Sequence, residues 1–253
     1  MKLKEKVAVI TGGGTGIGRD AAMALAREGA KIIVSGRRLE PLEETVQLIK
    51  SEGGEAAAVS ADVTNWDSIS ALQEATKKLY GNVDILVNNA GSALYKPFLD
   101  ITLEEFDYVM NIDLRSVFAV TKAFVPMMIE NGGGSVINIS SILGVFGGMN
   151  QSAYCAAKGG VNNMTRALAA ELGPMQIRVN CICPSHIETP MMAPMLDHLK
   201  EKGKMEKLEK VFPLRRIGFP ADTSGAVLFY AGPDSSWVTG TIMVLDGGMS
   251  CFV

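Results

Sequence analysis

The chain is poor in the residues from which metal centres and disulfide frameworks are usually built. Its 253 residues include only two histidines and four cysteines, Cys155, Cys181, Cys183 and Cys251. Cys181 and Cys183 lie too close together to staple a fold of this size, and with His186 they fall short of the ligand set that zinc requires. We therefore expect free thiols and no metal site.

Long hydrophobic runs and blocks of basic residues are also missing. The apolar run near the N-terminus is too short for a secretory signal, and no other segment approaches the length of a membrane span. The formal net charge is −3, and Lys and Arg occur only in short pairs, which gives no electrostatic support to a nucleic-acid or membrane partner. These absences predict a cytoplasmic protein whose partners include neither nucleic acid nor membrane.

The sequence instead alternates short β-branched runs with longer amphipathic segments, in a chain that is 47% hydrophobic and 20% charged. Near-continuous apolar runs are typical of strands in a parallel sheet that is covered on both faces. The alternation predicts a single α/β domain over residues 1–253, a Rossmann-like doubly wound parallel sheet of about seven strands with helices on both faces. The expected strands cover residues 6–10, 31–35, 55–60, 83–88, 135–140, 177–182 and 241–245. The expected helices cover residues 16–28, 40–51, 66–80, 102–130, 152–172 and 221–231.

One segment interrupts this alternation. Residues 190–213 are rich in lysine and methionine and are bounded by prolines. They follow the carboxyl end of an expected strand, which is where ligands bind in open α/β sheets. We expect a mobile substrate lid, the alternative being a solvated helical hairpin without a role.

The stretch "VITGGGTGIG" joins the first expected strand to the first expected helix. Gly12, Gly16 and Gly18 put no Cβ in the way, so backbone amides at the helix N-terminus can hold a pyrophosphate. The spacing Thr-Gly-x3-Gly-x-Gly resembles that of the short-chain dehydrogenase/reductase family, and the resemblance extends over essentially the whole chain. It implies hydride transfer between a nicotinamide cofactor and a ketone or secondary alcohol.

Three further motifs carry the same resemblance, in the same order along the chain. "NNAG" (88–91) follows the fourth expected strand and "NISS" (138–141) ends the fifth. Tyr154 and Lys158 are four residues apart, which places them on one face of a helix.

The resemblance implies that Ser141, Tyr154 and Lys158 are catalytic and that Asn111 completes a tetrad. A phenol with a pKa of about 10 is a poor base at neutral pH, and the Lys158 ammonium is expected to lower the pKa of Tyr154. In reduction Tyr154 would donate a proton to the carbonyl oxygen, to which Ser141 donates a hydrogen bond. Lys158 would also hold the nicotinamide ribose, and Asn111 would anchor a water that relays protons to Lys158.

Cofactor choice is predicted from the end of the second expected strand, "VSGRR". Family members selective for NAD place an acid where this chain has Gly36, whereas Arg37 is available to pair with a 2′-phosphate. NADP(H) is therefore favoured over NAD(H), the alternative being that Arg37 and Arg38 merely face solvent. Ser185 stands where the family usually has glycine. His186 is expected to face solvent, the alternative being a contact with the substrate. The resemblance implies cofactor contacts at Gly12, Thr15, Gly16, Ile17, Gly18, Ser35, Arg37, Arg38, Asp62, Val63, Asn89, Ala90, Gly91, Tyr154, Lys158, Pro184, Ser185, Ile187 and Thr189.

The expected substrate site is largely apolar and adaptable, which favours a fairly apolar small ketone or secondary alcohol. One alternative is a 3-oxoacyl-[acyl-carrier-protein] reductase, although the helix ends "MIENGGGS" and "ELGPMQ" offer no basic residue to dock the acidic carrier. A second is a non-catalytic nucleotide sensor on the same fold, which the intact Ser141, Tyr154 and Lys158 disfavour. The resemblance also implies a homo-oligomer, most simply a tetramer. The expected substrate residues are Ser141, Leu143, Met149, Gln151, Tyr154, Met191, Met192 and Met195.

Overall fold

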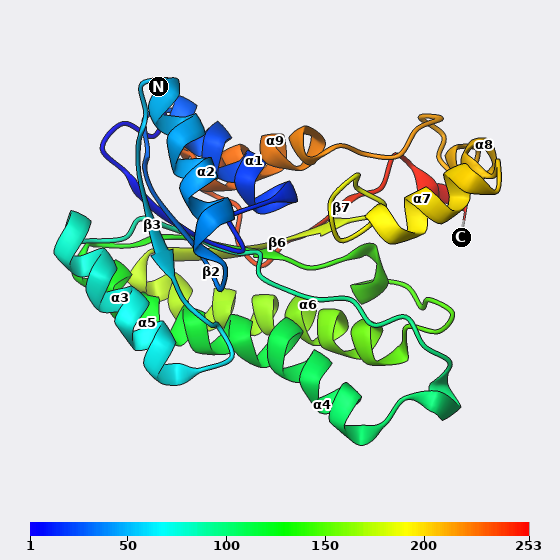
Figure 1. Cartoon of the computed structure of the whole chain (residues 1–253). Coiled ribbons are helices and arrows are strands. Elements are labelled where there is room, and N and C mark those ends of the chain that lie inside the picture. Colours follow the sequence, from blue (N-terminus) through cyan, green and yellow to red (C-terminus); the bar gives the residue numbers. More distant parts are fainter. Residues whose placement is uncertain (253) are drawn as a thin grey trace.

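The strands form one parallel sheet in the order β3-β2-β1-β4-β5-β6-β7 (Figure 1). A computed structural model describes the backbone of residues 1–252 and the side chains of residues 1–251, and the sheet lies within this range. The strand order reverses between β1 and β4, so the carboxyl ends of these two strands open a crevice. The predicted doubly wound sheet is confirmed, and every strand overlaps its expected range. The strands are β1 (Val7–Thr11), β2 (Lys31–Gly36), β3 (Glu55–Ser60), β4 (Ile85–Asn88), β5 (Gly134–Ile139), β6 (Ile177–Pro184) and β7 (Ile242–Leu245).

Helices cover both faces of the sheet, and the strands bury alternate residues on each side. On one face α1, α2 and α9 pack over Ala8 and Ile10 of β1, and on the other α3, α5 and α6 pack over Val7 and Val9 (Figure 1). This period of two explains why the central strands read as continuous apolar runs. None of the helices in residues 1–252 combines the length and apolar character needed to cross a membrane.

The helices are α1 (Gly16–Arg27), α2 (Leu39–Ser51), α3 (Trp66–Tyr80), α4 (Leu103–Met110), α5 (Ser116–Glu130), α6 (Ser152–Leu172), α7 (Ala193–Glu201), α8 (Met205–Glu209) and α9 (Pro220–Ala231). Short 3₁₀ turns occur at η1 (Phe98–Asp100), η3 (Ile142–Gly144), η4 (Gly173–Met175), η5 (Pro233–Ser235) and η6 (Met249–Phe252).

The segment 102–130, expected as one helix, consists of α4, a π-helical turn η2 (Asn111–Arg115) and α5. A π turn fits an extra residue into the helix, and such turns are frequent at functional sites. Ile112 and Asp113 are both buried in it. The expectation of a continuous α-helix is wrong here, because hydrophobic periodicity does not resolve a single inserted residue.

Residues 190–213 contain two short helices, α7 and α8, at the same end of the molecule as the C-terminus (Figure 1). Leu196 and Phe212 are buried in a small apolar cluster with Ile217. Ile187, before the segment, pairs as an isolated bridge with Gly218, after it. Residues 190–213, here called the flap, are therefore folded around their own apolar cluster, and the Ile187–Gly218 bridge joins the chain at its two ends. The role of the flap as a lid stays a prediction.

Candidate functional site

The glycine-rich turn between β1 and α1 is built for close packing. Gly12 and Gly16 have φ of +65° and +54°, the left-handed region that favours glycine. A Cβ at Gly18 would lie 2.3 Å from the Gly12 carbonyl oxygen, so the first turn of α1 rests directly on the loop. A Cβ at Gly16 would lie 3.1 Å from Thr189 Cγ2, so the same loop also contacts the chain after β6.

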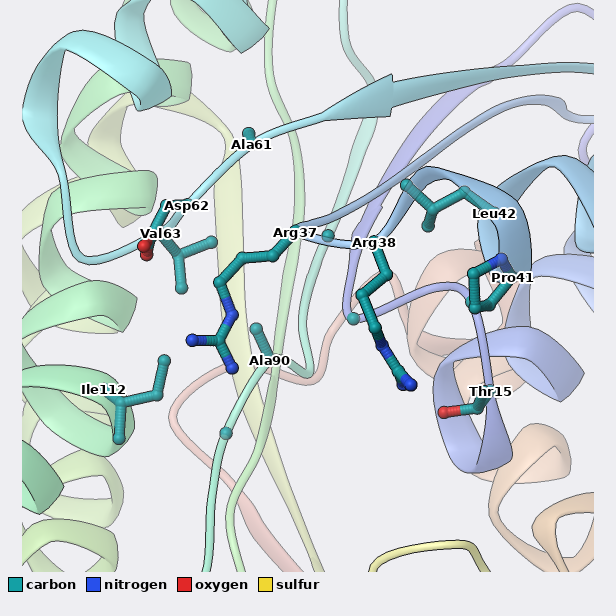
Figure 2. Close-up of a pocket in the computed structure, with 14 residues that line it drawn as sticks. Thr15, Arg37, Arg38, Pro41, Leu42, Ala61, Asp62, Val63, Ala90 and Ile112 are labelled. Carbon is teal, nitrogen blue, oxygen red and sulfur yellow. The ribbon is translucent and has the colours of Figure 1, made fainter.

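A cavity of about 480 Å³ opens beside this turn, at the carboxyl ends of β1, β2 and β4. Arg37 and Arg38 extend into it from the loop after β2 (Figure 2). The absence of side chains at Gly12 and Gly14, together with the N-terminus of α1, suits the pyrophosphate of a dinucleotide. The lining residues are Gly12, Gly14, Thr15, Gly36, Arg37, Arg38, Pro41, Leu42, Ala61, Asp62, Val63, Ala90, Gly91 and Ile112.

Eight of the expected cofactor residues are among these, namely Gly12, Thr15, Arg37, Arg38, Asp62, Val63, Ala90 and Gly91. Two others support the cavity from behind. Ser35 is fully buried, and its carbonyl oxygen accepts the Gly13 N–H of the glycine turn at 3.1 Å. Gly36, the next residue, lines the cavity, and a direct cofactor contact of Ser35 stays a prediction. The Asn89 side-chain amide donates to the Thr11 and Gly12 carbonyl oxygens at 3.0 and 3.1 Å, which holds the turn in shape.

The expected residues at the end of β6 and after it, Pro184, Ser185, Ile187 and Thr189, do not line this cavity, and neither do Gly16, Ile17 and Gly18 in the first turn of α1. Ser185 lines a second cavity, of about 220 Å³. Its hydroxyl lies 3.1 Å from His186 Nδ1 and donates a hydrogen bond to the sulfur of Met249, so it already has protein partners. His186 packs edge-on against Phe212, with ring centroids 5.7 Å apart. Burial lowers the pKa of His186, and the expectation that this ring faces solvent is wrong. Ile187 forms the bridge to Gly218, and Thr189 contacts Gly16.

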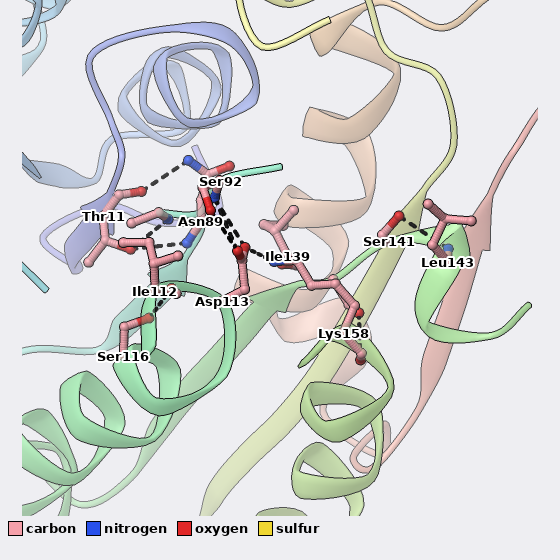
Figure 3. A network of polar contacts seen from close by, with 12 residues as sticks. Thr11, Asn89, Ser92, Ile112, Asp113, Ser116, Ile139, Ser141, Leu143 and Lys158 are labelled. Atoms are coloured by element: carbon pink, nitrogen blue, oxygen red, sulfur yellow. Dashed lines mark hydrogen bonds and ion pairs between the residues drawn. The ribbon is translucent and has the colours of Figure 1, made fainter. Parts of the chain in front are cut away.

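Ser141, Tyr154 and Lys158 are brought together where β5 ends and α6 begins. The Ser141 hydroxyl caps η3 by accepting the Leu143 N–H at 3.1 Å (Figure 3). Lys158 Nζ lies 5.6 Å from the centre of the Tyr154 ring and donates to the Ile139 carbonyl oxygen at 3.3 Å. The neighbouring Ser140 hydroxyl donates to the Lys158 carbonyl oxygen at 3.0 Å and is therefore a structural contact.

The electrostatics of this cluster differ from the simple expectation. Burial raises the pKa of Tyr154, the Lys158 ammonium lowers it, and the Asp113 carboxylate raises it, with a net shift upward. Burial lowers the pKa of Lys158, but Tyr154 and Asp113 raise it, again with a net shift upward. The predicted influence of Lys158 on the phenol has the right sign, but burial outweighs it in the protein alone.

Asn111 is not the residue that reaches Lys158. Its amide oxygen accepts from Arg115 at 3.2 Å, and its side chain lines a surface groove with Tyr108. Asp113, two residues later in η2, is fully buried and its carboxylate lies 3.2 Å from Lys158 Nζ (Figure 3). In this structure it is Asp113, and not Asn111, whose side chain lies against Lys158, and the water relay predicted for Asn111 stays a prediction. The available signal was an aspartate placed between two apolar residues, Ile112 and Leu114, in the segment that leads into α5.

The expected substrate residues beyond the cluster fall into two groups. Leu143 and Gln151 flank Gly148, where an added Cβ would lie 2.7 Å from the leucine and 3.0 Å from the glutamine. Met149, Met191 and Met195 are exposed, whereas Met192 packs against the cluster of Leu196, Phe212 and Ile217.

Comparison with known proteins agrees with this geometry. The family model described as enoyl-(acyl carrier protein) reductase matches residues 12–250. The chain is 38% identical over 249 residues to the 3-oxoacyl-[acyl-carrier-protein] reductase FabG of Thermotoga maritima, covering 98% of this chain and 99% of the relative. Among solved structures, levodione reductase superposes with a TM-score of 0.95 at 36% identity, covering 99% of this chain and 100% of the other. An actinorhodin polyketide ketoreductase with NADPH gives a TM-score of 0.93 at 33% identity, with 96% and 97% covered.

This chain belongs to the short-chain dehydrogenase/reductase family. As a member of it, the protein is an NAD(P)-dependent oxidoreductase that acts on CH–OH and C=O groups. The predicted family, fold and reaction class are thereby confirmed. When bound, the nicotinamide supplies or accepts the hydride, and the cavity beside the glycine turn fits the dinucleotide that carries it.

The tight packing at Gly18 leads to a prediction for Gly18→Ala. The added methyl would lie 2.3 Å from the Gly12 carbonyl oxygen and 2.5 Å from Asn89 Nδ2, so the turn must open. We expect a loss of about 1–3 kcal/mol in the free energy of unfolding, measured with urea. Weaker NADP(H) binding in a fluorescence titration is expected as well, because the turn helps to form the cavity.

Gly225→Ala in α9 is the matched control, because its Cβ would meet nothing within 4 Å. That variant should be neutral or more stable by about 0.5–1 kcal/mol. Equal stability and cofactor affinity in the two variants would contradict the packing argument.

Proposed function

We propose that this protein interconverts a fairly apolar small ketone and its secondary alcohol, with NADP(H) as the preferred cofactor. The observation that supports this is the junction between the cavity and the Ser141–Tyr154–Lys158 cluster. Gly91 lines the cavity, and a Cβ built on it would lie 3.5 Å from Lys158 Nζ. A dinucleotide in the cavity would therefore end beside the ammonium and the phenol.

The proposed chemistry assigns one task to each side chain. The Tyr154 hydroxyl donates its proton to the carbonyl oxygen as the carbonyl carbon receives the hydride, so the C=O bond becomes a CH–OH group. The Ser141 hydroxyl donates a hydrogen bond to the same oxygen and holds it in place. Lys158 binds the nicotinamide ribose and stabilises the phenolate left on Tyr154.

Tyr154→Phe tests these roles. The variant should keep its fold and its cofactor affinity but lose turnover by about 10²–10⁴-fold, because only the proton donor is removed. Turnover of a ketone panel is followed by NADPH absorbance, and cofactor affinity by fluorescence. Tyr80→Phe is the control, because it removes the same hydroxyl group from a tyrosine at the end of α3, away from the site. It should retain turnover within about twofold. Retention of more than about a tenth of wild-type kcat in Tyr154→Phe would overturn the assignment.

The preference for NADPH is supported by the charges around Gly36. Arg37 and Arg38 are exposed, extend into the cavity, and form no ion pair with a carboxylate in residues 1–251 (Figure 2). A 2′-phosphate beside them would gain charge-assisted hydrogen bonds. Position 36 is a glycine, so it carries no carboxylate that would repel the 2′-phosphate or bind the ribose hydroxyls of NAD.

Arg37→Ala should weaken NADPH binding by about ten- to a hundredfold and leave NADH nearly unchanged, because a charge-assisted hydrogen bond contributes about 1.5–3 kcal/mol. Gly36→Asp should go further and shift the preference to NADH. A Cβ at Gly36 would meet only Leu42 Cδ2 at 3.7 Å, so this substitution fits without strain. The measurement is kcat/KM for both cofactors, with Arg27→Ala as the control.

Two results would contradict the cofactor proposal. A wild-type enzyme that prefers NADH would by itself contradict the proposed preference for NADPH. Equal losses for both cofactors in Arg37→Ala would mean that Arg37 holds the loop rather than the phosphate.

A second candidate substrate is a 3-oxoacyl group on acyl carrier protein, favoured by the relative of that name from Thermotoga maritima. Against it, α5 ends at Glu130 and α6 at Leu172 with no basic residue before the next strand. Residues 190–213, which we propose as a substrate lid, instead present the exposed side chains of Met191 and Met195. Comparing kcat/KM for one 3-oxoacyl group on the carrier protein and on free pantetheine separates the two. A carrier preference above about tenfold would favour the second candidate.

We also propose that the chain assembles with copies of itself, as a tetramer. Support comes from a groove along α4, η2, α5 and α6, where Tyr108 and Phe118 remain 51% and 49% exposed beside Leu114 and Met164. Half-exposed aromatic side chains of this kind are enriched at protein interfaces. Neither the tetramer nor the cytoplasmic location is tested by the fold, and both stay predictions.

Sedimentation velocity at micromolar concentration tests the assembly. Phe118→Glu should dissociate it, because a charge would be buried in an apolar contact. Leu79→Glu, at a half-exposed leucine on α3, should not. A monomeric wild type would count against the proposal.

A further inference from the structure

Asp113 contacts Lys158 directly, yet the family resemblance did not point to it. It lies in the π turn η2 with no exposed surface, and its carboxylate accepts hydrogen bonds from the Ser92 N–H at 3.1 Å and the Ser92 hydroxyl at 3.0 Å. Lys158 Nζ lies 3.2 Å from Oδ1 (Figure 3). The resemblance implied an asparagine on this helix, which is neutral, whereas the residue that meets Lys158 carries a charge.

The backbone around Asp113 is shaped to admit that charge. A Cβ at Gly91 would lie 2.6 Å from Asp113 Oδ1, so the loop after β4 approaches the carboxylate as closely as a glycine allows. A carboxylate removed from water is costly unless it is paired and hydrogen-bonded, and here both conditions are met. The Lys158 and Asp113 side chains are only 4% and 0% exposed, so solvent screens the pair weakly.

The Asp113 carboxylate, paired with Lys158, changes the effect of the Lys158 ammonium on the pKa of Tyr154. The titratable and charged groups that face the phenol are Lys158 and Cys155 of α6 and Asp113 of η2, and Ser141 contacts it as a neutral partner. Cys181 of β6 also acts on the ammonium and raises the pKa of Lys158. Asp113 acts on the pKa of Tyr154 in the opposite direction to Lys158, since it raises that pKa.

We propose that Asp113 is a positioning residue that fixes the Lys158 ammonium and offsets its charge at Tyr154, so that the phenol stays protonated at neutral pH and the enzyme is set for carbonyl reduction. The inference rests on the proposed function, because it needs Tyr154 to be the proton donor. Reduction requires the phenol, so its rate falls as pH rises through the pKa of Tyr154. Oxidation requires the phenolate, so its rate rises through the same pKa.

Asp113→Asn removes the charge while keeping the size of the side chain and an oxygen that can accept from Ser92. With the ammonium no longer offset, the phenolate is favoured and the pKa of Tyr154 falls. We expect the oxidation profile, plotted as kcat/KM for a secondary alcohol against pH, to move down by about one pH unit. At neutral pH the oxidation rate should rise by up to about tenfold, because one unit corresponds to a tenfold change in phenolate. The alkaline limb of ketone reduction should move down by the same amount.

Ser92→Ala is the matched control, because it removes a hydrogen bond to the same carboxylate but keeps the charge. Its pH midpoint should stay at the wild-type value even if KM changes, and a midpoint that moved as far as in Asp113→Asn would overturn the electrostatic account. Cofactor affinity and thermal stability measured on all variants report whether each is folded.

Two further measurements keep the outcomes separate. Tyr154→Phe with wild-type activity would overturn the proposed function itself, whereas an inactive Tyr154→Phe with an unshifted Asp113→Asn profile would overturn only this inference. If Asp113→Asn fails to fold, the wild-type profile decides: oxidation should still be rising above about pH 8, and a plateau reached below about pH 7 would overturn the inference.

Discussion

The site depends on the hydrogen bonds that hold the ends of β1 and β4 together where the strand order reverses. The Thr11 hydroxyl accepts the N–H groups of Asn89 and Ala90 at 3.0 and 3.1 Å, and the Asn89 side chain returns two bonds to the other loop. The two loops are far apart in the chain, since Thr11 and Asn89 are separated by 78 positions. Tying them together places the glycine turn and Ala90–Gly91 on one wall of one cavity.

From this junction a continuous series of polar contacts runs to the reacting groups. The chain passes from Asn89 to Ser92, whose N–H and hydroxyl donate to Asp113, and Asp113 pairs with Lys158 (Figure 3). Lys158 Nζ in turn lies 5.6 Å from the centre of the Tyr154 ring. Because the carboxylate and the ammonium are both removed from water, neither can shift far without losing its partner. The loop after β4, the π turn and the first turns of α6 are therefore held in fixed positions relative to one another. Proton transfer requires such a fixed arrangement of the reacting groups.

Most of the fold could be predicted from the sequence, because its signals are local and strong. Two-sided burial makes the central strands continuous apolar runs, and the glycine spacing marks the first turn. The predictions failed where tertiary contacts decide the outcome. Asn111 and Asp113 are both polar residues on one helical pattern, and only the π turn determines which of them faces Lys158. The orientation of His186 likewise depends on Phe212, which lies in the flap beyond it.

The π turn also sets the tolerance of this segment to changes in length. One residue of an α-helix corresponds to a rotation of about 100° around its axis. Removing a single residue from η2 would let α4 and α5 fuse into a regular helix, but it would turn all of α4 relative to the sheet. Tyr108 would then leave the groove that it shares with Phe118, although neither its identity nor its neighbours in the chain had changed. The length of this helical segment, and not only its composition, is thus part of the information that specifies the site, in contrast to surface loops, which accept insertions and deletions readily.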